Sequence, residues 1–205
     1  MEIKKILPLG FASNTYILTA DEKSCVLIDC AQPRVFKECE KLGLKPEYVL
    51  LTHGHYDHIG GCGELFGHGA KIICGSQEKD LIFSDDNRAI FHGITIPHFE
   101  IYKTVEDGEE LDLCGIKFKV ISTPGHTKGG VCYLAENNLF TGDTLFFESV
   151  GRCDLATGDS SALVKSVKKL YSLAGDLHVF CGHGENTTLN HERAFNPYIN
   201  DGSAR

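Results

Sequence analysis

Several features that mark other classes of protein are missing from this chain of 205 residues. No run of lysine and arginine builds a basic stripe, and the formal net charge is -8 with a pI near 5.6. Because a protein that follows a phosphate backbone needs such a stripe, we expect no nucleic-acid partner. No uninterrupted apolar span approaches the roughly 20 residues of a membrane helix, so no membrane partner is expected either.

The N-terminus and the cysteines lack the features of an exported protein. The opening residues, MEIKKILPLG, hold only a short apolar stretch that Pro8 and Gly10 interrupt, too short for the core of a signal peptide. The nine cysteines are scattered, odd in number and never in a C-x-x-C arrangement, so no disulfide framework is expected. Reduced thiols that pack as small hydrophobes suit a reducing compartment, and we therefore predict a cytoplasmic location.

No Gly/Ser/Pro-rich linker divides the chain, and we predict one domain over residues 1–205. A chain of this length buries roughly 70% of its unfolded surface, so it does not need a metal merely to fold. Apolar and alternating stretches predict strands at 14–19, 25–30, 48–51, 70–74, 117–122, 131–135, 139–141 and 179–181. Helical spacing predicts helices at 35–42, 61–66, 163–171 and 187–195. Strands and helices thus recur in both halves, which favours an α/β fold of packed sheets covered by helices.

Residues 84–99 show no clean period, and we expect a loop with fragments of helix there. The sequence does not say what this segment does.

Four apolar stretches each run into residues that can bind a metal: YVLLTHGHYDH, FKVISTPGH, NLFTGD and LHVFCGH. A lone histidine is usually a solvated loop residue, but so many donors in this arrangement predict a site for two metal ions. If the backbone is extended, side chains two positions apart share a face, which predicts that His53, His55 and Asp57 converge while His58 turns toward a second ion. The complete set of predicted donors is His53, His55, Asp57, His58, His126, Asp143 and His183.

The motif T-H-x-H-x-D-H, with the later G-H, T-G-D and G-H-G and the span GRCDL at 151–155, resembles the metallo-β-lactamase superfamily. Within it the chain is most similar, over nearly its whole length, to the glyoxalase II (hydroxyacylglutathione hydrolase) branch. The resemblance implies an αββα sandwich, in which helices flank two mixed sheets, with metals at one edge. It also implies that one ion takes His53, His55 and His126, that the other takes Asp57, His58 and His183, and that Asp143 bridges the two. Asp29 would support a ligating imidazole by a hydrogen bond.

The activity that the resemblance implies is metal-dependent hydrolysis of a thioester such as S-lactoylglutathione. Two divalent ions would lower the pKa of a bridging water, and the resulting hydroxide would attack the acyl carbon. Zinc is the default, with iron or manganese as alternatives, because imidazole and carboxylate accept all three. The leaving thiol, with a pKa near 8.5, needs no strong proton donor, although Asp57 is a candidate proton shuttle.

The substrate is expected to be a small anionic thioester, but its recognition is less well defined. Arg152 matches the position of a basic residue that contacts glutathione in glyoxalase II proteins, and the alternative for it is a surface salt bridge. Asp154 stands where a glutathione-contacting tyrosine is expected. The sequence also ends soon after His183, and we therefore expect the chain to lack the helical C-terminal domain of the longer enzymes.

Two other functions stay open on the sequence. Persulfide dioxygenase-like members of the same superfamily bind one iron through two histidines and an aspartate, which would make the chain an oxidoreductase. A non-catalytic metal-binding module is the third interpretation, because a fold alone does not establish an activity. The sequence does not predict the oligomeric state.

Overall fold

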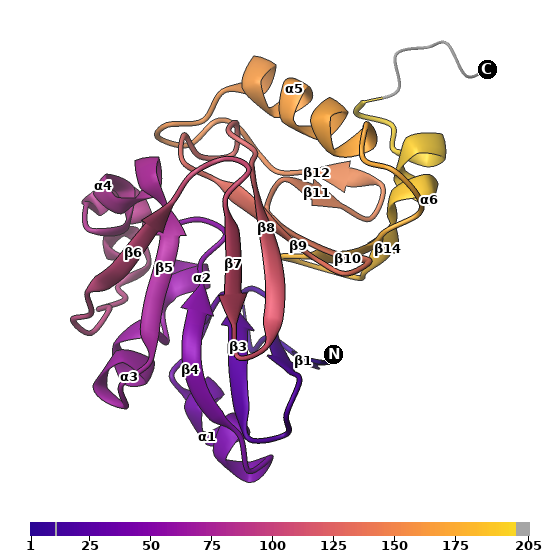
Figure 1. Cartoon of the computed structure of the whole chain (residues 1–205). Helices are drawn as coiled ribbons and strands as arrows, with labels where there is room; N and C mark the ends of the chain where they lie inside the picture. Colours follow the sequence, from indigo (N-terminus) through magenta and orange to yellow (C-terminus); the bar gives the residue numbers. More distant parts are fainter. Residues whose placement is uncertain (11, 200–205) are drawn as a thin grey trace.

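Two six-stranded mixed sheets form the centre of the computed structural model, which describes residues 1–10 and 12–199 (Figure 1). In the first sheet, β1 to β3 pair antiparallel and β3 to β6 pair parallel. Its strands, in spatial order, are β1 (Glu2–Ile6), β2 (Thr15–Thr19), β3 (Ser24–Ile28), β4 (Lys45–Leu50), β5 (Lys71–Gly75) and β6 (Ile101–Val105). The predicted domain of residues 1–205 extends beyond the described residues, and its extent stays a prediction.

The second sheet holds the C-terminal strands. Its strands, in spatial order, are β14 (Thr187–Thr188), β13 (His178–Cys181), β10 (Asn138–Gly142), β9 (Val131–Ala135), β8 (Ile116–Ser122) and β7 (Glu110–Leu113). Only β10 and β13 pair parallel; the other neighbours are antiparallel. A small hairpin of β11 (Leu145–Phe146) and β12 (Ser149–Val150) stands beside this sheet.

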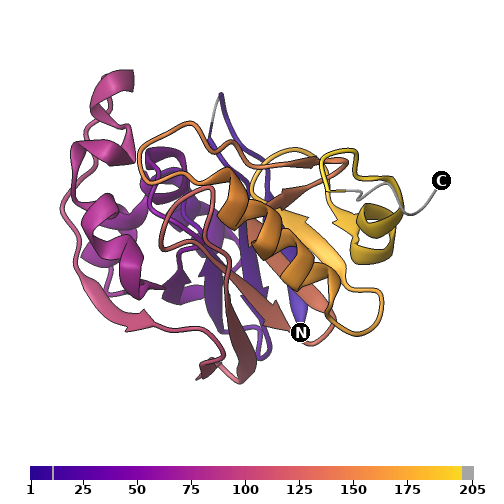
Figure 2. The ribbon, with the colours of Figure 1, turned by 90° about the horizontal axis from the view of Figure 1, so that it is seen from above.

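Helices cover the outer face of each sheet (Figure 2). The first sheet carries α1 (Arg34–Lys41), α2 (Tyr56–Ile59), α3 (Cys62–Gly67) and α4 (Lys79–Ile82), and the second carries α5 (Ser160–Tyr171) and α6 (Leu189–Phe195). Three single turns of 3-10 helix lie between β5 and β6: η1 (Ser76–Glu78), η2 (Asp85–Asn87) and η3 (Ile90–His92). The predicted αββα sandwich is therefore confirmed.

The buried apolar side chains form three clusters, one at each interface of this sandwich. Strand β2 shows how alternation produces them: Ile17 packs against the helices, while Tyr16 and Leu18 pack against the second sheet. Both faces of a central strand are then buried, which is why such strands read as nearly continuous apolar runs. The third cluster joins α5 and α6 to the outer face of the second sheet.

All eight predicted strands are present, and all eight occupy interior positions in the two sheets. The edge strands β1, β6, β7 and β14 were not predicted. The prediction of a helix from residue 187 is wrong at its start, because Thr187–Thr188 pairs with β13 and α6 begins at Leu189. Residues 84–99 form a loop with helical turns, as expected.

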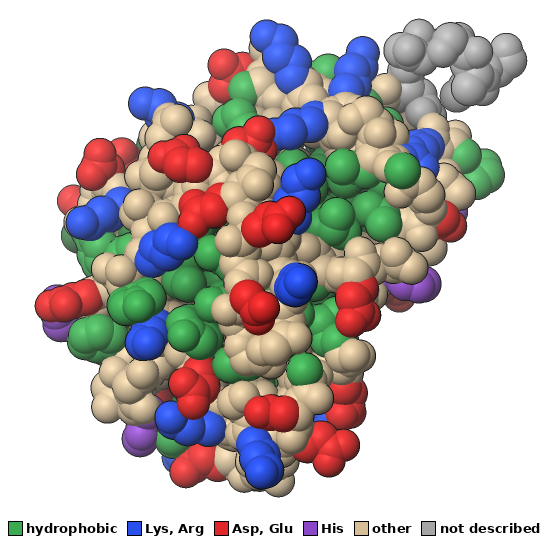
Figure 3. Space-filling model, in the orientation of Figure 1, with side chains coloured by type: hydrophobic (Ala, Val, Ile, Leu, Met, Phe, Trp, Pro, Cys, Tyr) green, Lys and Arg blue, Asp and Glu red, His purple; other side chains and the backbone are tan. Residues whose placement is uncertain are grey.

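Other expectations concern the surface and the thiols. All nine cysteines are free. No helix in the described parts of the chain is long and apolar enough to cross a bilayer. On the face seen in Figure 3, acidic and basic side chains are interspersed rather than gathered by sign. The predicted absence of a nucleic-acid partner stays a prediction.

Candidate metal centre

The donors meet because the strands that precede them end at the same edge of the sandwich. In the second sheet β10 is parallel to β13, and two antiparallel pairings relate β8 to β10, so all three strands run in one direction. Their carboxyl ends deliver His126, Asp143 and His183. In the first sheet, β3 and β4 are parallel and deliver Asp29 and His53. The carboxyl ends of parallel strands are a common place for a functional site in α/β proteins.

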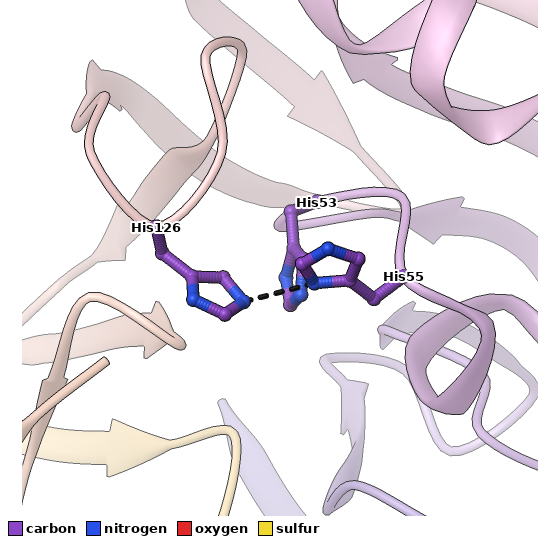
Figure 4. A group of neighbouring side chains, drawn as sticks. All are labelled: His53, His55 and His126. Carbon is purple, nitrogen blue, oxygen red and sulfur yellow. Dashed lines mark hydrogen bonds between the residues drawn. The ribbon is translucent and has the colours of Figure 1, made fainter. Parts of the chain in front are cut away.

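The structure brings all seven predicted donors together in three overlapping groups, within each of which the donor atoms lie within 4.8 Å of one another. His53, His55 and His126 form the first, which we call the imidazole group (Figure 4). Asp57, His58 and His183 form the second, the mixed group. Asp143 joins the two, since it forms the third group with His53 and His58.

Asp57 does not lie where the spacing of the motif placed it. The expectation that Asp57 converges with His53 and His55 on an extended strand is wrong, because α2 begins at Tyr56. His55 is still extended, but after it the helical period replaces the alternation of a strand. Asp57 consequently turns to the mixed group, where its Oδ2 lies 3.1 Å from His183 Nε2. The ligand sets implied by the family resemblance agree with this grouping.

Asp143 lies between the two groups of donors. Its Oδ1 is 3.2 Å from His58 Nε2, and its Oδ2 is 3.5 Å from His126 Nε2 and 3.6 Å from His183 Nε2. This is the arrangement that a bridging carboxylate requires. Gly182 permits it, because a β-carbon at that position would overlap Asp143 Oδ1 and lie 2.9 Å from His58 Cε1.

Asp29 is buried behind both groups and orients one histidine of each. Its Oδ2 lies 2.8 Å from His58 Nδ1 and accepts a hydrogen bond of 2.8 Å from Thr52 Oγ1. Because the Thr52 hydroxyl donates its hydrogen to Asp29, its oxygen accepts a hydrogen bond from His53 Nδ1 at 3.2 Å. In the neutral imidazoles these contacts place the proton on Nδ1 of His53 and His58, so each Nε2 then turns its lone pair toward the centre; without a metal, the neighbouring carboxylates favour a second proton on His58, which a cation would replace.

His126 is oriented in the same way by the backbone. Its Nδ1 donates to the carbonyl oxygen of Arg152 at 2.8 Å, so its Nε2 carries the lone pair. That Nε2 lies 2.9 Å from His55 Nδ1, and Figure 4 shows the two nitrogens pointing at each other.

Orphaned polar atoms test whether the residues fit a pair of ions. Nε2 of His53, His55 and His58 and Oδ1 of Asp143 are buried and have no hydrogen-bond partner among the described residues. The 3.2 Å approach of His58 Nε2 to Asp143 Oδ1 does not have the geometry of a hydrogen bond. Each unmet atom costs about 1–3 kcal/mol, a cost that a divalent cation would remove. Imidazole and carboxylate donors suit zinc, iron and manganese, so the residues fit a binuclear centre.

The charges of the two groups differ. Burial and the neighbouring imidazoles lower the pKa of His55 to about 3, and the pKa of His53 is lowered well below its usual value for the same reasons. Burial also acts against a charge on His58, but Asp143, Asp29 and Asp57 outweigh it and raise its pKa well above the usual value. The imidazole group therefore offers neutral donors, whereas the mixed group attracts positive charge.

Glu78 is a buried residue at this centre that sequence reasoning missed. Its Oε1 accepts a hydrogen bond of 2.9 Å from the backbone N–H of Gly54, between two donors, and its Oε2 accepts one of 3.0 Å from Thr127 Oγ1, next to His126. Burial raises its pKa to about 7, although these hydrogen bonds oppose the rise. Glu78 thus joins the two loops of the imidazole group. It stands in the polar segment SQEKD, where no local signal marks it.

A cavity of about 470 Å³ opens over the centre. Both groups of donors contribute to its walls, and its other lining residues are Tyr56, Arg88, His92, Phe146, Arg152 and Leu155. Arg152, predicted to bind substrate, reaches the cavity, but its guanidinium donates two hydrogen bonds of 2.7 Å to Asp154.

Comparison with known proteins gives a consistent family. The model of the metallo-beta-lactamase superfamily matches residues 8–183. Hydroxyacylglutathione hydrolase GloC of Haemophilus influenzae is 33% identical over 99% of this chain and 100% of its own length. The crystal structure of TTHA1623 in a di-iron-bound form has a TM-score of 0.83 and 33% identity, and the match covers 94% of this chain and 98% of that one. BLEG-1 B3 metallo-beta-lactamase has a TM-score of 0.89 and 30% identity, covering 97% and 100%.

Proposed function

Since this chain belongs to the metallo-beta-lactamase superfamily, as its motifs predicted, we propose that it is a binuclear metal-dependent thioester hydrolase of the glyoxalase II type. The observation that carries the proposal is the convergence of seven donors, four of which have a buried polar atom with no hydrogen-bond partner among the described residues. The full-length similarity to hydroxyacylglutathione hydrolase GloC supports S-lactoylglutathione as the substrate to test first.

The imidazole group would hold one ion, the mixed group the other, and Asp143 would contact both. Zinc is the default metal; the di-iron form of TTHA1623 supports iron as the alternative, and manganese suits the same donors. When bound, two such ions supply an activated water near neutral pH and positive charge for the oxyanion of the acyl group.

The chain's own residues orient the metal ligands, and they provide no proton donor for the leaving group. Asp29 and the carbonyl of Arg152 hold Nδ1 of His58 and of His126 away from the centre, so these two imidazoles would not have to reorient when a metal binds. Burial acts against ionisation of Asp57, but the charge of His58 and the hydrogen bond with His183 outweigh it and lower its pKa. An ionised Asp57 can accept a proton but has none to donate. A thiolate leaves without a proton donor, whereas an amine does not, and this favours thioesters over amides.

The test is a turnover assay on protein of measured metal content, loaded separately with zinc and with iron. We expect release of one thiol per S-lactoylglutathione consumed, and loss of that activity when a chelator removes the metal. Oxygen uptake with glutathione persulfide, in place of thiol release, would identify the oxidoreductase instead. Metal retention without hydrolysis of thioesters, lactones or phosphoesters would leave a non-catalytic metal-binding module.

The remaining proposals concern the setting of the enzyme. We propose a small anionic thioester as the partner of the cavity and a reducing cytoplasm as the location, on the composition and the nine free thiols.

A further inference from the structure

Two arginines line the cavity above the metal centre, and they differ in what holds them. The guanidinium of Arg152 is already paired with Asp154. Its Nε donates to Oδ1 and its Nη2 to Oδ2, both at 2.7 Å. This two-pronged contact is the geometry in which a guanidinium binds a carboxylate most strongly. A substrate carboxylate would have to displace Asp154 before it could occupy that edge of Arg152.

Arg88 comes from the 84–99 segment and has a free edge. Its Cζ lies 4.4 Å from the centroid of the Phe91 ring, so the guanidinium is stacked on an aromatic face. No carboxylate of residues 1–10 and 12–199 lies within 4 Å of its guanidinium nitrogens, and its side chain makes no hydrogen bond to those residues. A guanidinium stacked on its face keeps the N–H donors along its edge available.

The charge of Arg88 lies at the cavity wall and acts on a group beside it. Arg88 lines the cavity together with Arg152, the partner of Asp154. The hydrogen bond from Arg152 lowers the pKa of Asp154 to about 2, and Arg88 adds to this effect. Arg88 therefore provides positive charge within the cavity, where an anionic ligand would be held.

The backbone at Arg88 is built to place this side chain. Arg88 follows the turn η2 and has a φ of 75°, in the left-handed region that costs a non-glycine residue about 1–3 kcal/mol. Asn87 holds the strained turn on both sides, since its Nδ2 donates to the Ile82 carbonyl at 2.9 Å and its Oδ1 accepts from the Ala89 N–H at 2.8 Å. Strain maintained in this way at the wall of a cavity motivates a functional role.

We propose that Arg88 binds a carboxylate on the thiol part of the substrate and so selects anionic over neutral thioesters. This role of Arg88 rests on the proposed thioester hydrolysis. It adds to that function a residue of the 84–99 segment that recognises the negative charge of the substrate. A guanidinium matches a carboxylate with two parallel hydrogen bonds, and glutathione carries two carboxylates. Arg152, with the same charge at the same cavity but already paired with Asp154, serves as the matched control.

The kinetic experiment compares S-lactoylglutathione with the lactoyl thioester of N-acetylcysteamine, a neutral thiol. Hydrogen bonds to charged groups contribute about 1.5–3 kcal/mol, so Arg88→Ala should lower the preference for the charged thioester about 10-fold to 100-fold, mainly through KM. Arg88→Lys should recover part of that preference, because it keeps the charge but not the planar fork. Arg152→Ala should change the preference less than Arg88→Ala does.

A binding measurement separates this inference from the proposed hydrolysis. S-methylglutathione has no thioester to cleave, and calorimetry on the zinc-loaded protein should show weaker binding for Arg88→Ala than for wild type and Arg152→Ala. That result supports the role of Arg88 even if no thioester is hydrolysed, in which case the proposed function fails alone. Equal binding by wild type and Arg88→Ala, no binding by wild type, or an unchanged preference in an active enzyme would overturn the role of Arg88.

Discussion

The imidazole group and the mixed group are built from similar residues but differ in access and charge. His53, His55 and His126 are each at most 5% exposed, whereas the side chain of His183 is 35% exposed at the cavity. The imidazole group contains no carboxylate, while the mixed group contains Asp57 and adjoins Asp143 and Asp29. The comparison indicates that the mixed group carries the charge and that its His183 is the donor most open to the cavity, although both groups line it.

Two single substitutions, one in each group, should give the largest loss of metal and activity, and they test whether the donors form two groups. His55 and His183 suit this test because each belongs to one group only. His55→Ala and His183→Ala should each lower bound metal from two ions per chain to one. Each should also lower thioester hydrolysis about 10³-fold, since an ion contributes several kcal/mol to the transition state.

Metal content by elemental analysis and turnover are the measurements. His68→Ala removes an exposed histidine that stacks on Phe36, and it should retain both ions. Two ions retained in His55→Ala or His183→Ala would contradict the two-group arrangement.

Asp29 should couple the two groups, with an intermediate effect. Asparagine at this position cannot accept from Thr52 and His58 as a carboxylate does, so Asp29→Asn should weaken metal binding by both groups, about 10-fold to 100-fold. Thr52→Val interrupts only the branch that reaches His53 and should weaken binding less. Titration with a competing chelator measures both affinities. If Asp29→Asn weakens the binding of only one ion, Asp29 does not couple the two groups.

Interior and edge strands show how much of the fold the sequence could predict. Every interior strand was predicted, because its core-facing residues read either as an apolar run, as in β2, or as a clear alternation, as in β8. All four edge strands were missed. An edge strand keeps charged and polar side chains, as in EIKKI of β1 and IYKTV of β6, and therefore lacks that pattern.

The donors could be predicted for the same reason, since each follows an interior strand. Their distribution between groups could not be worked out from spacing, because the four-residue helix α2 is too short to show a period and yet turns Asp57 to the other group. Glu78 and Arg88 could not be predicted at all. Each is one of several charged residues in its segment, and no local pattern shows that Glu78 contacts Gly54 and Thr127 or that Arg88 lines the cavity.

Glu78 supports the imidazole group alone, and its replacement should give the smallest effect, visible in the pH dependence of stability. Burial raises its pKa to about 7 from an ordinary value of 4.5. Because the folded protein binds the Glu78 proton more tightly than the unfolded chain does, protonation of Glu78 stabilises the fold. This stabilisation is fully present below pH 4.5 and is lost as the pH rises through about 7. The loss amounts to roughly 3 kcal/mol at most.

Glu78→Gln should therefore lose less stability than wild type between pH 5 and pH 8, even if it is less stable at pH 5. Denaturant unfolding with a chelator present throughout measures this, because pH-dependent metal binding then does not contribute. The exposed Glu40→Gln should keep the wild-type dependence. If Glu78→Gln also keeps the wild-type pH dependence, the pKa of Glu78 is not raised in the folded protein. Water would then reach this carboxylate more freely than its burial indicates.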